Sequence, residues 1–158
     1  MATTTYAIAL GSNRRGRHGA PEAEVGAALA AIGAARASRV IASAPLGPSI
    51  RRFANAAALV ESDLSPLAML ARLKAIERAF GRRPGRRWGA RVIDLDIALW
   101  SGGRVASRVL TIPHRELRHR AFVLRPLAEI VPGWRDSASG LTISQLHARL
   151  TRRRALPS

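Results

Sequence analysis

The stretch that most constrains the fold is residues 92–100, VIDLDIALW, because apolar residues occupy every second position along it. A period of two is typical of a β-strand, whose alternate side chains point to opposite faces of the sheet. The face predicted to be buried carries Ile93, Leu95, Ile97 and Leu99. The opposite face carries Val92, Asp94, Asp96, Ala98 and Trp100. The pattern therefore predicts a strand with one core face and one acidic face.

The two aspartates of this strand need partners for their charge. Side chains two residues apart on a strand lie roughly 6–7 Å apart on the same side. Like charges this close raise at least one pKa unless a cation lies between them. Mg²⁺ is commonly held by one or two carboxylates together with substrate phosphates. Asp94 and Asp96 are therefore either metal ligands or acids on a solvated face that pair with nearby arginines, and this stretch alone favours neither.

The rest of the chain alternates between strand and helix patterns. Further strands are predicted at 6–10, 39–43 and 53–61. Helices are predicted at 22–35, 66–80, 115–130 and 143–150, and 151–158 is predicted to be a frayed tail. The order βαββαβ, followed by additional helices, predicts a ferredoxin-like α+β sandwich with a mainly antiparallel sheet. Because no linker of domain-separating length interrupts the pattern, residues 1–158 are predicted to form a single domain.

The charge of this 158-residue chain, which has no cysteine, is strongly positive. It carries 26 basic and 10 acidic side chains, a net charge of +16, and Lys74 is its only lysine. GC-rich coding alone favours arginine, but a field this positive attracts polyanions, either nucleic acid or a small phosphorylated ligand. Because no signal-type or membrane-length apolar run occurs, we expect a cytoplasmic protein with no membrane partner.

The basic loop 81–91, GRRPGRRWGAR, leads directly into the acidic strand and holds five arginines and no acid. Carboxylates beside a cationic loop suit a complex of metal and polyphosphate, because arginines neutralise phosphate oxygens while the acids hold the metal. A merely solvated basic loop is the alternative. The chain has neither a Walker-type phosphate loop nor a GxSxG elbow. His114 follows Pro113, where a turn can aim its ring into a cleft.

Five segments together resemble a known family. They are LGSN at 10–13, APLGP at 44–48, FANA at 53–56, RWGARVIDLDIALW at 87–100 and LTIPHRELRHRAFVLRPL at 110–127. The chain is similar, from about Tyr6 to Trp134, to the 6-hydroxymethyl-7,8-dihydropterin pyrophosphokinases of folate biosynthesis. This resemblance implies an enzyme that transfers the pyrophosphoryl group of ATP to the hydroxymethyl group of the dihydropterin and releases AMP.

The resemblance also implies roles for individual residues. It implies that Asp94 and Asp96 hold two Mg²⁺ ions. The catalytic arginines that it implies are Arg82 or Arg83, and Arg91. On the nucleotide side it implies Arg87, Trp88, Ile97, Thr111, His114 and Arg120, with part of the 65–80 helix near the adenine. On the pterin side it implies Ser43, Ala44, Leu46, Phe53, Asn55 and Phe122, with Asn55 at the ring edge and Phe53 and Phe122 on either side of the ring.

Two other readings remain open at this point. One is an α+β module that binds RNA, which the charge supports. Against it, the chain has only three Phe, three Trp and one Tyr, in no clustered strand motif of the kind that stacks bases. The other is a catalytically silent relative that keeps the fold. We expect ATP and the dihydropterin as partners, no nucleic acid and a monomer.

Overall fold

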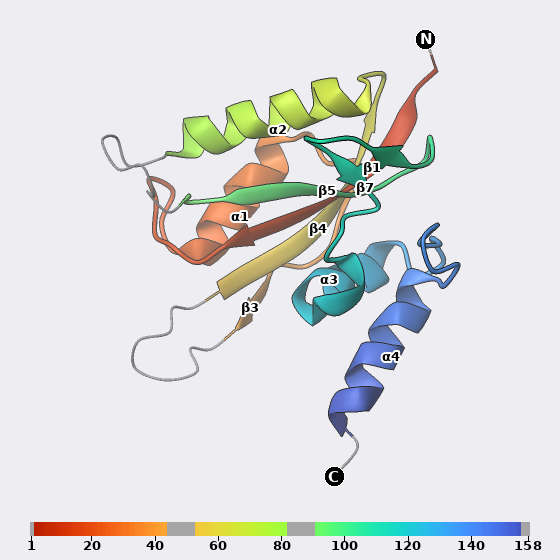
Figure 1. The fold of residues 1–158 in the computed structure, drawn as a ribbon. Coiled ribbons are helices and arrows are strands. Elements are labelled where there is room, and N and C mark those ends of the chain that lie inside the picture. The colour runs from red at the N-terminus through yellow and green to blue at the C-terminus, as the bar shows by residue number, and fades with distance from the viewer. Residues whose placement is uncertain (1, 44–52, 82–90, 156–158) are drawn as a thin grey trace.

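The central feature of the fold is an antiparallel sheet between two layers of helices (Figure 1). The structure, a computed structural model, describes residues 2–43, 53–81 and 91–155. The sheet has the order β2–β4–β1–β5, and β3 also pairs with β4. Its strands are β1 (Thr4–Ser12), β2 (Arg36–Ala37), β3 (Ile41–Ser43), β4 (Phe53–Ser62) and β5 (Asp94–Trp100). The helices are α1 (Pro21–Ala31), α2 (Pro66–Phe80), α3 (Ala121–Ile130) and α4 (Ile143–Ala155). This arrangement confirms the predicted ferredoxin-like α+β class.

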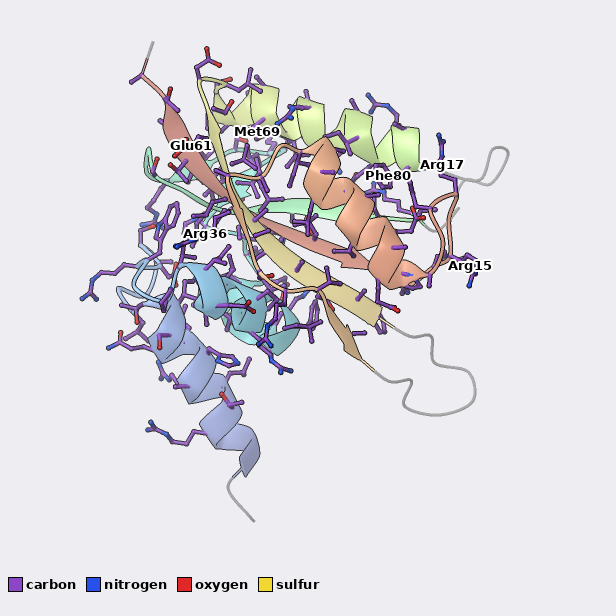
Figure 2. All side chains as sticks on the ribbon, turned by 180° about the vertical axis from the view of Figure 1, so that it is seen from behind. Arg15, Arg17, Arg36, Glu61, Met69 and Phe80 are labelled. Carbon is purple, nitrogen blue, oxygen red and sulfur yellow. The ribbon has the colours of Figure 1, made fainter. Side chains whose placement is uncertain are left out.

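Helices α1 and α2 cover one face of the sheet, and large aliphatic side chains fill the space between them. The sheet contributes Tyr6, Ile8, Leu10, Leu95 and Ile97 to this core, and Ile93, just before β5, joins them, each 3% exposed or less. Met69 and Phe80 of α2 lie above them (Figure 2). Ser65 caps α2 as its sequence predicts, because its side chain accepts a hydrogen bond from the Ala68 N–H, 3.3 Å away. Gly81, with φ of 116°, ends the helix.

Helices α3 and α4 cover part of the opposite face, against smaller side chains of the sheet. This second core contains Ala7, Ala57, Ala98 and Leu99 from the sheet. Leu124, Leu127, Ile143 and Leu146 contribute from the two helices. Because alanines leave the backbone of β1 and β4 close to the surface of this face, helices or a ligand can approach it closely.

The predicted alternation of β5 is confirmed from residue 93 to 97 and is wrong at its end. The pairing with β1 shifts register between Ala7 and Ile8, so that Ile97 opposes Ile8 while Leu99 opposes Ala7. Ala98 is the extra residue of this bulge, and a bulge reverses the alternation beyond it. Leu99 therefore lies in the core under α3 and α4, and Trp100 stacks on Tyr6 on the opposite face, with ring centroids 6.0 Å apart.

The strand predicted at 39–43 is confirmed only at Ile41–Ser43 (β3), and a further short strand, β2 (Arg36–Ala37), precedes it, with Ser38 next to β2 between the two. The Ser38 hydroxyl accepts from the Ala57 N–H and the Ser38 N–H donates to the Ala57 carbonyl oxygen, each at 2.9 Å. The Ser38 hydroxyl thus accepts a hydrogen bond that a backbone carbonyl accepts in a regular sheet, and the strand is interrupted there. The predicted helix 22–35 ends earlier, at Ala31, because Gly33 adopts a φ of 67°.

Three further differences lie in the C-terminal half of the chain. The predicted helix 115–130 is split into a 3₁₀ turn, η1 (Leu117–His119), and α3, because Arg120 between them is extended. A short hairpin of β6 (Val105–Ala106) and β7 (Thr111–Ile112) has no counterpart in the prediction. Helix α4 continues to Ala155, into the stretch predicted to be frayed. Among the described residues, no helix is long and apolar enough to span a bilayer.

Candidate active site

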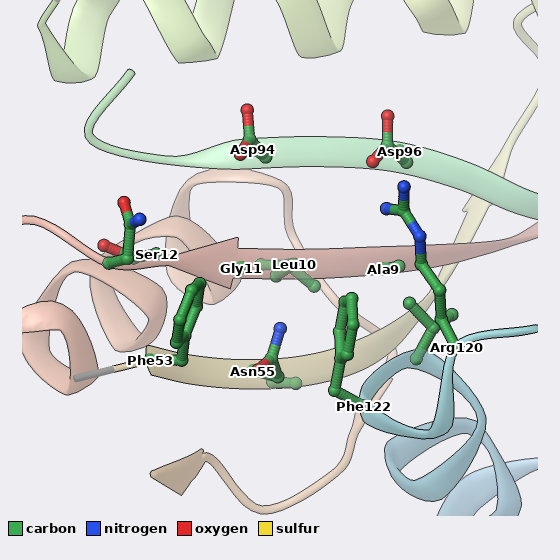
Figure 3. A pocket seen from close by; sticks show the side chains of 13 residues that line it. Ala9, Leu10, Gly11, Ser12, Phe53, Asn55, Asp94, Asp96, Arg120 and Phe122 are labelled. Carbon is green, nitrogen blue, oxygen red and sulfur yellow. The ribbon is translucent and has the colours of Figure 1, made fainter. Parts of the chain in front are cut away.

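Each aspartate of β5 lies at the end of a row of paired residues that crosses the sheet. Asn55 of β4 opposes Gly11 of β1, and Gly11 opposes Asp94. One pair further along β1, Ala9 opposes Asp96. Both carboxylate side chains are exposed and stand on the same strand, as the sequence predicts (Figure 3). Small residues in the middle strand leave open space between the acids of β5 and the side chains of β4. At Gly11 a Cβ atom would lie 3.0 Å from Asn55 Nδ2.

The electrostatics at Asp94 favour a cation. Partial desolvation raises the pKa of this carboxyl although 64% of the side chain is exposed, and the charge of Asp96 raises it further. Arg91 and Lys74 lower the pKa but do not cancel the rise. Arg91 Nη1 lies 3.9 Å from Asp94 Oδ1. A divalent cation between the two carboxylates would relieve the same repulsion.

Two exposed aromatic rings stand at the other side of this space. The Phe53 and Phe122 rings rise on either side of the Asn55 side chain (Figure 3). Phe53 is 43% exposed and Phe122 is 50% exposed. Large apolar side chains are rarely left this accessible in pairs without a ligand to cover them. Between the rings, the Asn55 amide offers one hydrogen-bond acceptor and two donors.

Arg120 lies between the aromatic and the acidic parts of the site. Its guanidinium carbon is 5.7 Å from the centroid of the Phe122 ring, within cation–π range. Arg120 and Asp96 also line a small hollow beside the main cavity, together with His114. His114 Nδ1 accepts from the Glu116 N–H at 3.1 Å, so the neutral ring carries its proton on Nε2 and can donate there.

A single cavity of about 200 Å³ joins these groups. Its lining includes six of the residues that the sequence predicts, namely Phe53, Asn55, Asp94, Asp96, Arg120 and Phe122. These come from β4, β5 and the start of α3, which are distant in the sequence. The structure thus brings three of the six predicted pterin residues and both predicted metal ligands to one place.

Other predicted site residues stand elsewhere. Ile97 is 3% exposed in the core under α1 and α2, and Thr111 pairs with Ala106 in the small hairpin. Neither lines the main cavity or the adjoining hollow. The backbone of Ser43 opposes Phe53 in the pairing of β3 with β4. Outside the described residues lie Ala44, Leu46, Arg82, Arg83, Arg87 and Trp88.

Two residues near the site were given no role from the sequence. Ser12 lines the cavity and is 5% exposed, and its hydroxyl donates to the Val92 carbonyl oxygen at 2.7 Å. Glu77 of α2 is also 5% exposed and contacts both Arg91 and the backbone of Leu95. Burial raises the pKa of Glu77, while the Leu95 N–H, Lys74 and Arg91 lower it without cancelling the rise, to which Asp94 adds. The signal for Glu77 is its place in the apolar stripe of α2.

The donor set suits a hard divalent cation that also binds phosphate. In the described part of the chain, no group of three or more His, Cys, Asp or Glu side chains is placed to hold a metal. A site of two carboxylates leaves most coordination positions to water and substrate. That is the usual arrangement for Mg²⁺ with phosphates and is unlike a structural zinc site.

A ferredoxin-like sandwich whose cavity joins paired carboxylates to paired aromatic rings defines an α+β protein built to bind a small ligand. A sequence profile of the family described as 7,8-dihydro-6-hydroxymethylpterin-pyrophosphokinase (HPPK) matches residues 7–132. The chain belongs to this family.

Several curated relatives carry the name 2-amino-4-hydroxy-6-hydroxymethyldihydropteridine pyrophosphokinase. The Haemophilus influenzae protein is 41% identical over 134 residues, which cover 80% of this chain and 81% of that protein. The Pseudomonas aeruginosa protein is 39% identical, with 81% of each chain covered. The Synechocystis protein is 41% identical over 76% of this chain, but the match spans only 62% of that protein's length.

The fold has a solved counterpart. A crystal structure of wild-type Plasmodium falciparum HPPK-DHPS with pteroate superposes with a TM-score of 0.74 at 14% identity. The match covers 96% of this chain and 43% of that one. At this identity the likeness concerns the fold, and it agrees with the ferredoxin-like class.

Proposed function

We propose that this protein transfers the pyrophosphoryl group of ATP to the hydroxymethyl group of 6-hydroxymethyl-7,8-dihydropterin and releases AMP. The observation that carries the proposal is the single cavity that holds two carboxylates and an arginine together with two rings and an amide. A pterin that carries a reactive hydroxyl and a nucleotide that carries phosphates require these two kinds of surface side by side. Membership of the family supports the same reaction.

The aromatic part of the cavity is the proposed pterin site. The pterin ring is flat and fits between Phe53 and Phe122, because aromatic faces favour offset stacking. Asn55 lies between the rings and pairs with the donors and acceptors at the ring edge. Ser43, Ala44 and Leu46 complete the proposed site.

The acidic part of the cavity is the proposed metal and phosphate site. Asp94 and Asp96 would hold Mg²⁺, and two ions are proposed. When bound, Mg²⁺ supplies charge neutralisation of the phosphate oxygens and of the leaving group. The carboxylates stand on a strand that pairs with β1 along its length, so their spacing is set before substrate arrives.

The cationic side chains around the acids are the proposed phosphate ligands. Arg91 and Arg120 present guanidinium groups whose N–H groups can donate in pairs to phosphate oxygens. His114 donates from Nε2. The family resemblance of the 81–91 loop adds further proposed ligands, namely Arg82 or Arg83, Arg87 and Trp88. Ile97 and Thr111 are proposed on the nucleotide side on the same ground.

The reaction needs positioning more than proton transfer. The hydroxymethyl oxygen forms a bond to the β-phosphorus of ATP, the bond from that phosphorus to the α,β-bridging oxygen breaks, and AMP leaves with that oxygen. The hydroxyl proton passes to solvent. The described residues that line the cavity include no histidine that could serve as a general base. Aligning two bound substrates and neutralising phosphate charge supply most of the catalysis in phosphoryl-type transfer.

Product analysis tests the proposal. The purified chain is incubated with MgATP and 6-hydroxymethyl-7,8-dihydropterin, and nucleotides are separated by chromatography. We expect AMP to appear in equal amount to the pterin diphosphate, and only when both the dihydropterin and Mg²⁺ are present. Formation of ADP, or no turnover with a folded protein, would contradict it. Sequence-selective RNA binding at physiological salt would favour the binding-module reading and would contradict the expectation that the protein has no nucleic-acid partner.

A further inference from the structure

Glu77 is a buried carboxylate that the proposed chemistry does not use. It lies on α2 in the stripe that also contains Leu73 and Phe80, and it is 5% exposed. A buried carboxylate without partners is costly, because it loses its hydration. Its partners therefore show what the residue does, and all of them lie at or beside the proposed metal site.

One oxygen of Glu77 binds the backbone between the two aspartates. Glu77 Oε2 accepts from the Leu95 N–H at 2.8 Å. Within the described residues β5 ends the sheet, so alternate N–H groups along it point away from β1 and have no strand partner. Leu95 is the residue between Asp94 and Asp96. Glu77 thus holds the backbone between the two residues that carry the carboxylates.

The other oxygen of Glu77 binds Arg91. Glu77 Oε1 accepts from Arg91 Nη1 at 3.3 Å, and the same nitrogen lies 3.9 Å from Asp94 Oδ1. Lys74 Nζ is 3.8 Å from Glu77 Oε1 and adds to the compensation of its charge. Arg91 precedes β5, whose pairing with β1 begins at Asp94, so the ladder does not hold it.

We propose that Glu77 is a positioning residue for the reaction. It fixes the backbone at Leu95, between Asp94 and Asp96, and aims Arg91 at the phosphate site before substrates bind. This inference rests on the proposed function, since it assigns a role within the same site. Packing alone would be met by an apolar side chain, such as those of Leu73 and Phe80 in the same stripe. Groups that orient metal ligands from behind affect catalysis although they touch neither substrate nor metal.

Two variants of Glu77 separate its two contacts. Glu77→Gln keeps an oxygen that can accept from the Leu95 N–H but loses the charge that holds Arg91. Glu77→Ala removes both. Glu61→Gln makes the same chemical change at an exposed position near the far end of β4 and serves as the control (Figure 2).

Steady-state kinetics give the first readout. We expect Glu77→Gln to lower kcat by about 10- to 100-fold, with the KM for the dihydropterin within about twofold of wild type. The reason is that Arg91 acts on the phosphates, whereas the ring site is untouched. Glu61→Gln should behave as wild type. A Glu77→Gln enzyme with normal kcat, or one whose only change is a lower Tm, would overturn the inference.

A double-variant cycle shows whether Glu77 acts through Arg91. If it does, Glu77→Gln should lower kcat little further in an Arg91→Ala background. Losses that multiply in the double variant would overturn the coupling. The Tm should follow the same cycle: Arg91→Ala leaves the buried carboxylate with less compensation, and adding Glu77→Gln should restore part of the lost Tm.

Hydrogen exchange at Leu95 gives a readout that needs no turnover. We expect the Leu95 amide to exchange several-fold faster in Glu77→Ala and to stay protected in Glu77→Gln. If the wild-type chain releases no AMP, the proposed function fails. The positioning role is then judged on exchange and on the Tm cycle, where unchanged Leu95 exchange in Glu77→Ala or additive Tm effects would overturn it. If Glu77→Ala fails to fold, the kinetic and Tm cycles of Glu77→Gln and Arg91→Ala still test the positioning role.

Discussion

The two faces of the sheet are built from the same strands but differ in side-chain size and in cover. On the face under α1 and α2, Ile8, Leu10 and Leu95 are at most 2% exposed. On the opposite face, their neighbours in sequence are Ala9, Gly11 and Asp94, which line the cavity. Alternation along a strand thus assigns stability to one set of positions and the proposed site to the other.

The second face is itself divided. At one end Ala7 and Ala57 are covered by α3 and α4, and at the other end Gly11 and Asn55 face the cavity. Small residues serve both ends, because they admit helices at one and a ligand at the other. A site placed on the back of a packed core is held rigidly without contributing to that core, and substitutions should separate the two roles.

The largest expected effect is on the open end of the second face. Asp96→Ala should lower kcat by about a thousandfold, equivalent to about 4 kcal/mol of transition-state stabilisation, because Mg²⁺ loses one of two protein ligands. The Tm should not fall, since the side chain is exposed and its removal relieves repulsion on Asp94. AMP release and thermal unfolding measure the two effects.

Asp63→Ala is the matched control, because it removes an exposed aspartate from the loop before α2. It should leave both quantities unchanged. Near-normal turnover of Asp96→Ala at ordinary Mg²⁺ would show that the strand carries a solvated acid instead of a metal ligand.

The next effect belongs to the covered face. Ile8→Ala should destabilise the protein by about 3 kcal/mol, because it leaves a cavity in a fully buried part of the core. At a temperature where the variant stays folded, kcat should remain close to wild type. Urea unfolding and the AMP assay report the two results.

The companion change lies one residue along the strand. Ala9→Leu places a large side chain in the cavity wall beside Asp96 and should block turnover with a smaller loss of stability. If Ile8→Ala and Ala9→Leu damaged stability and activity in the same proportion, the division between the two faces would be wrong.

Periodic patterns and helix caps in the sequence were enough to predict most of the strands and helices. The alternation in 92–97 placed both aspartates on one face, and Ser65 and Gly81 marked the ends of α2. The bulge at Ala98 could not be foreseen, because it depends on how β5 fits against β1 rather than on β5 alone. For the same reason the role of Ser38, which bonds to Ala57 across the sheet, has no local signal.

The site was predictable where the family pattern is specific and less so where residues act indirectly. Phe53, Asn55 and Phe122 meet Asp94 and Asp96 in one cavity, as the resemblance implied. That meeting depends on long-range pairing that no local pattern encodes. Glu77 has a signal that was readable, an acid in an apolar helical stripe, but its partners Leu95 and Arg91 are known only from the packing of α2 beside β5.

An intermediate effect is expected at Asp136, in the loop between α3 and α4, the two helices that cover the closed end of the second face. This carboxylate is fully buried; burial alone raises its pKa, but hydrogen bonds from Ser139, Ala138 and Arg118 outweigh burial and hold the pKa below its usual value. Asp136→Asn should lower the free energy of unfolding by about 2 kcal/mol at neutral pH.

The pH dependence of that difference follows from the sign of the shift. A pKa lowered in the folded state gives stability that is present above the unfolded pKa of about 3.9 and is lost as pH falls through the folded value. The gap between wild type and Asp136→Asn should therefore be constant near neutrality and shrink in acid, as measured by urea unfolding from pH 7 to pH 2. A gap that widened in acid would contradict the assignment. Activity per folded molecule should be unchanged.

The smallest expected effect tests the open end by shape alone. Phe122→Leu keeps an apolar side chain of similar bulk but removes the flat ring, which is half exposed and stabilises little of the fold. It also removes the ring under Arg120. Stacking is worth about 1 kcal/mol beyond burial, so the Kd for the dihydropterin should rise about fivefold while the KM for ATP changes less. Calorimetry on the enzyme loaded with a non-hydrolysable ATP analogue measures the first, and the AMP assay the second. Leu67→Ala, at an exposed apolar residue on α2 that is 55% accessible, is the control and should leave the Kd for the dihydropterin unchanged. A Phe122→Leu protein that bound the dihydropterin as wild type does would mean that the ring only covers surface, and the proposed pterin site would then depend on Phe53 and Asn55.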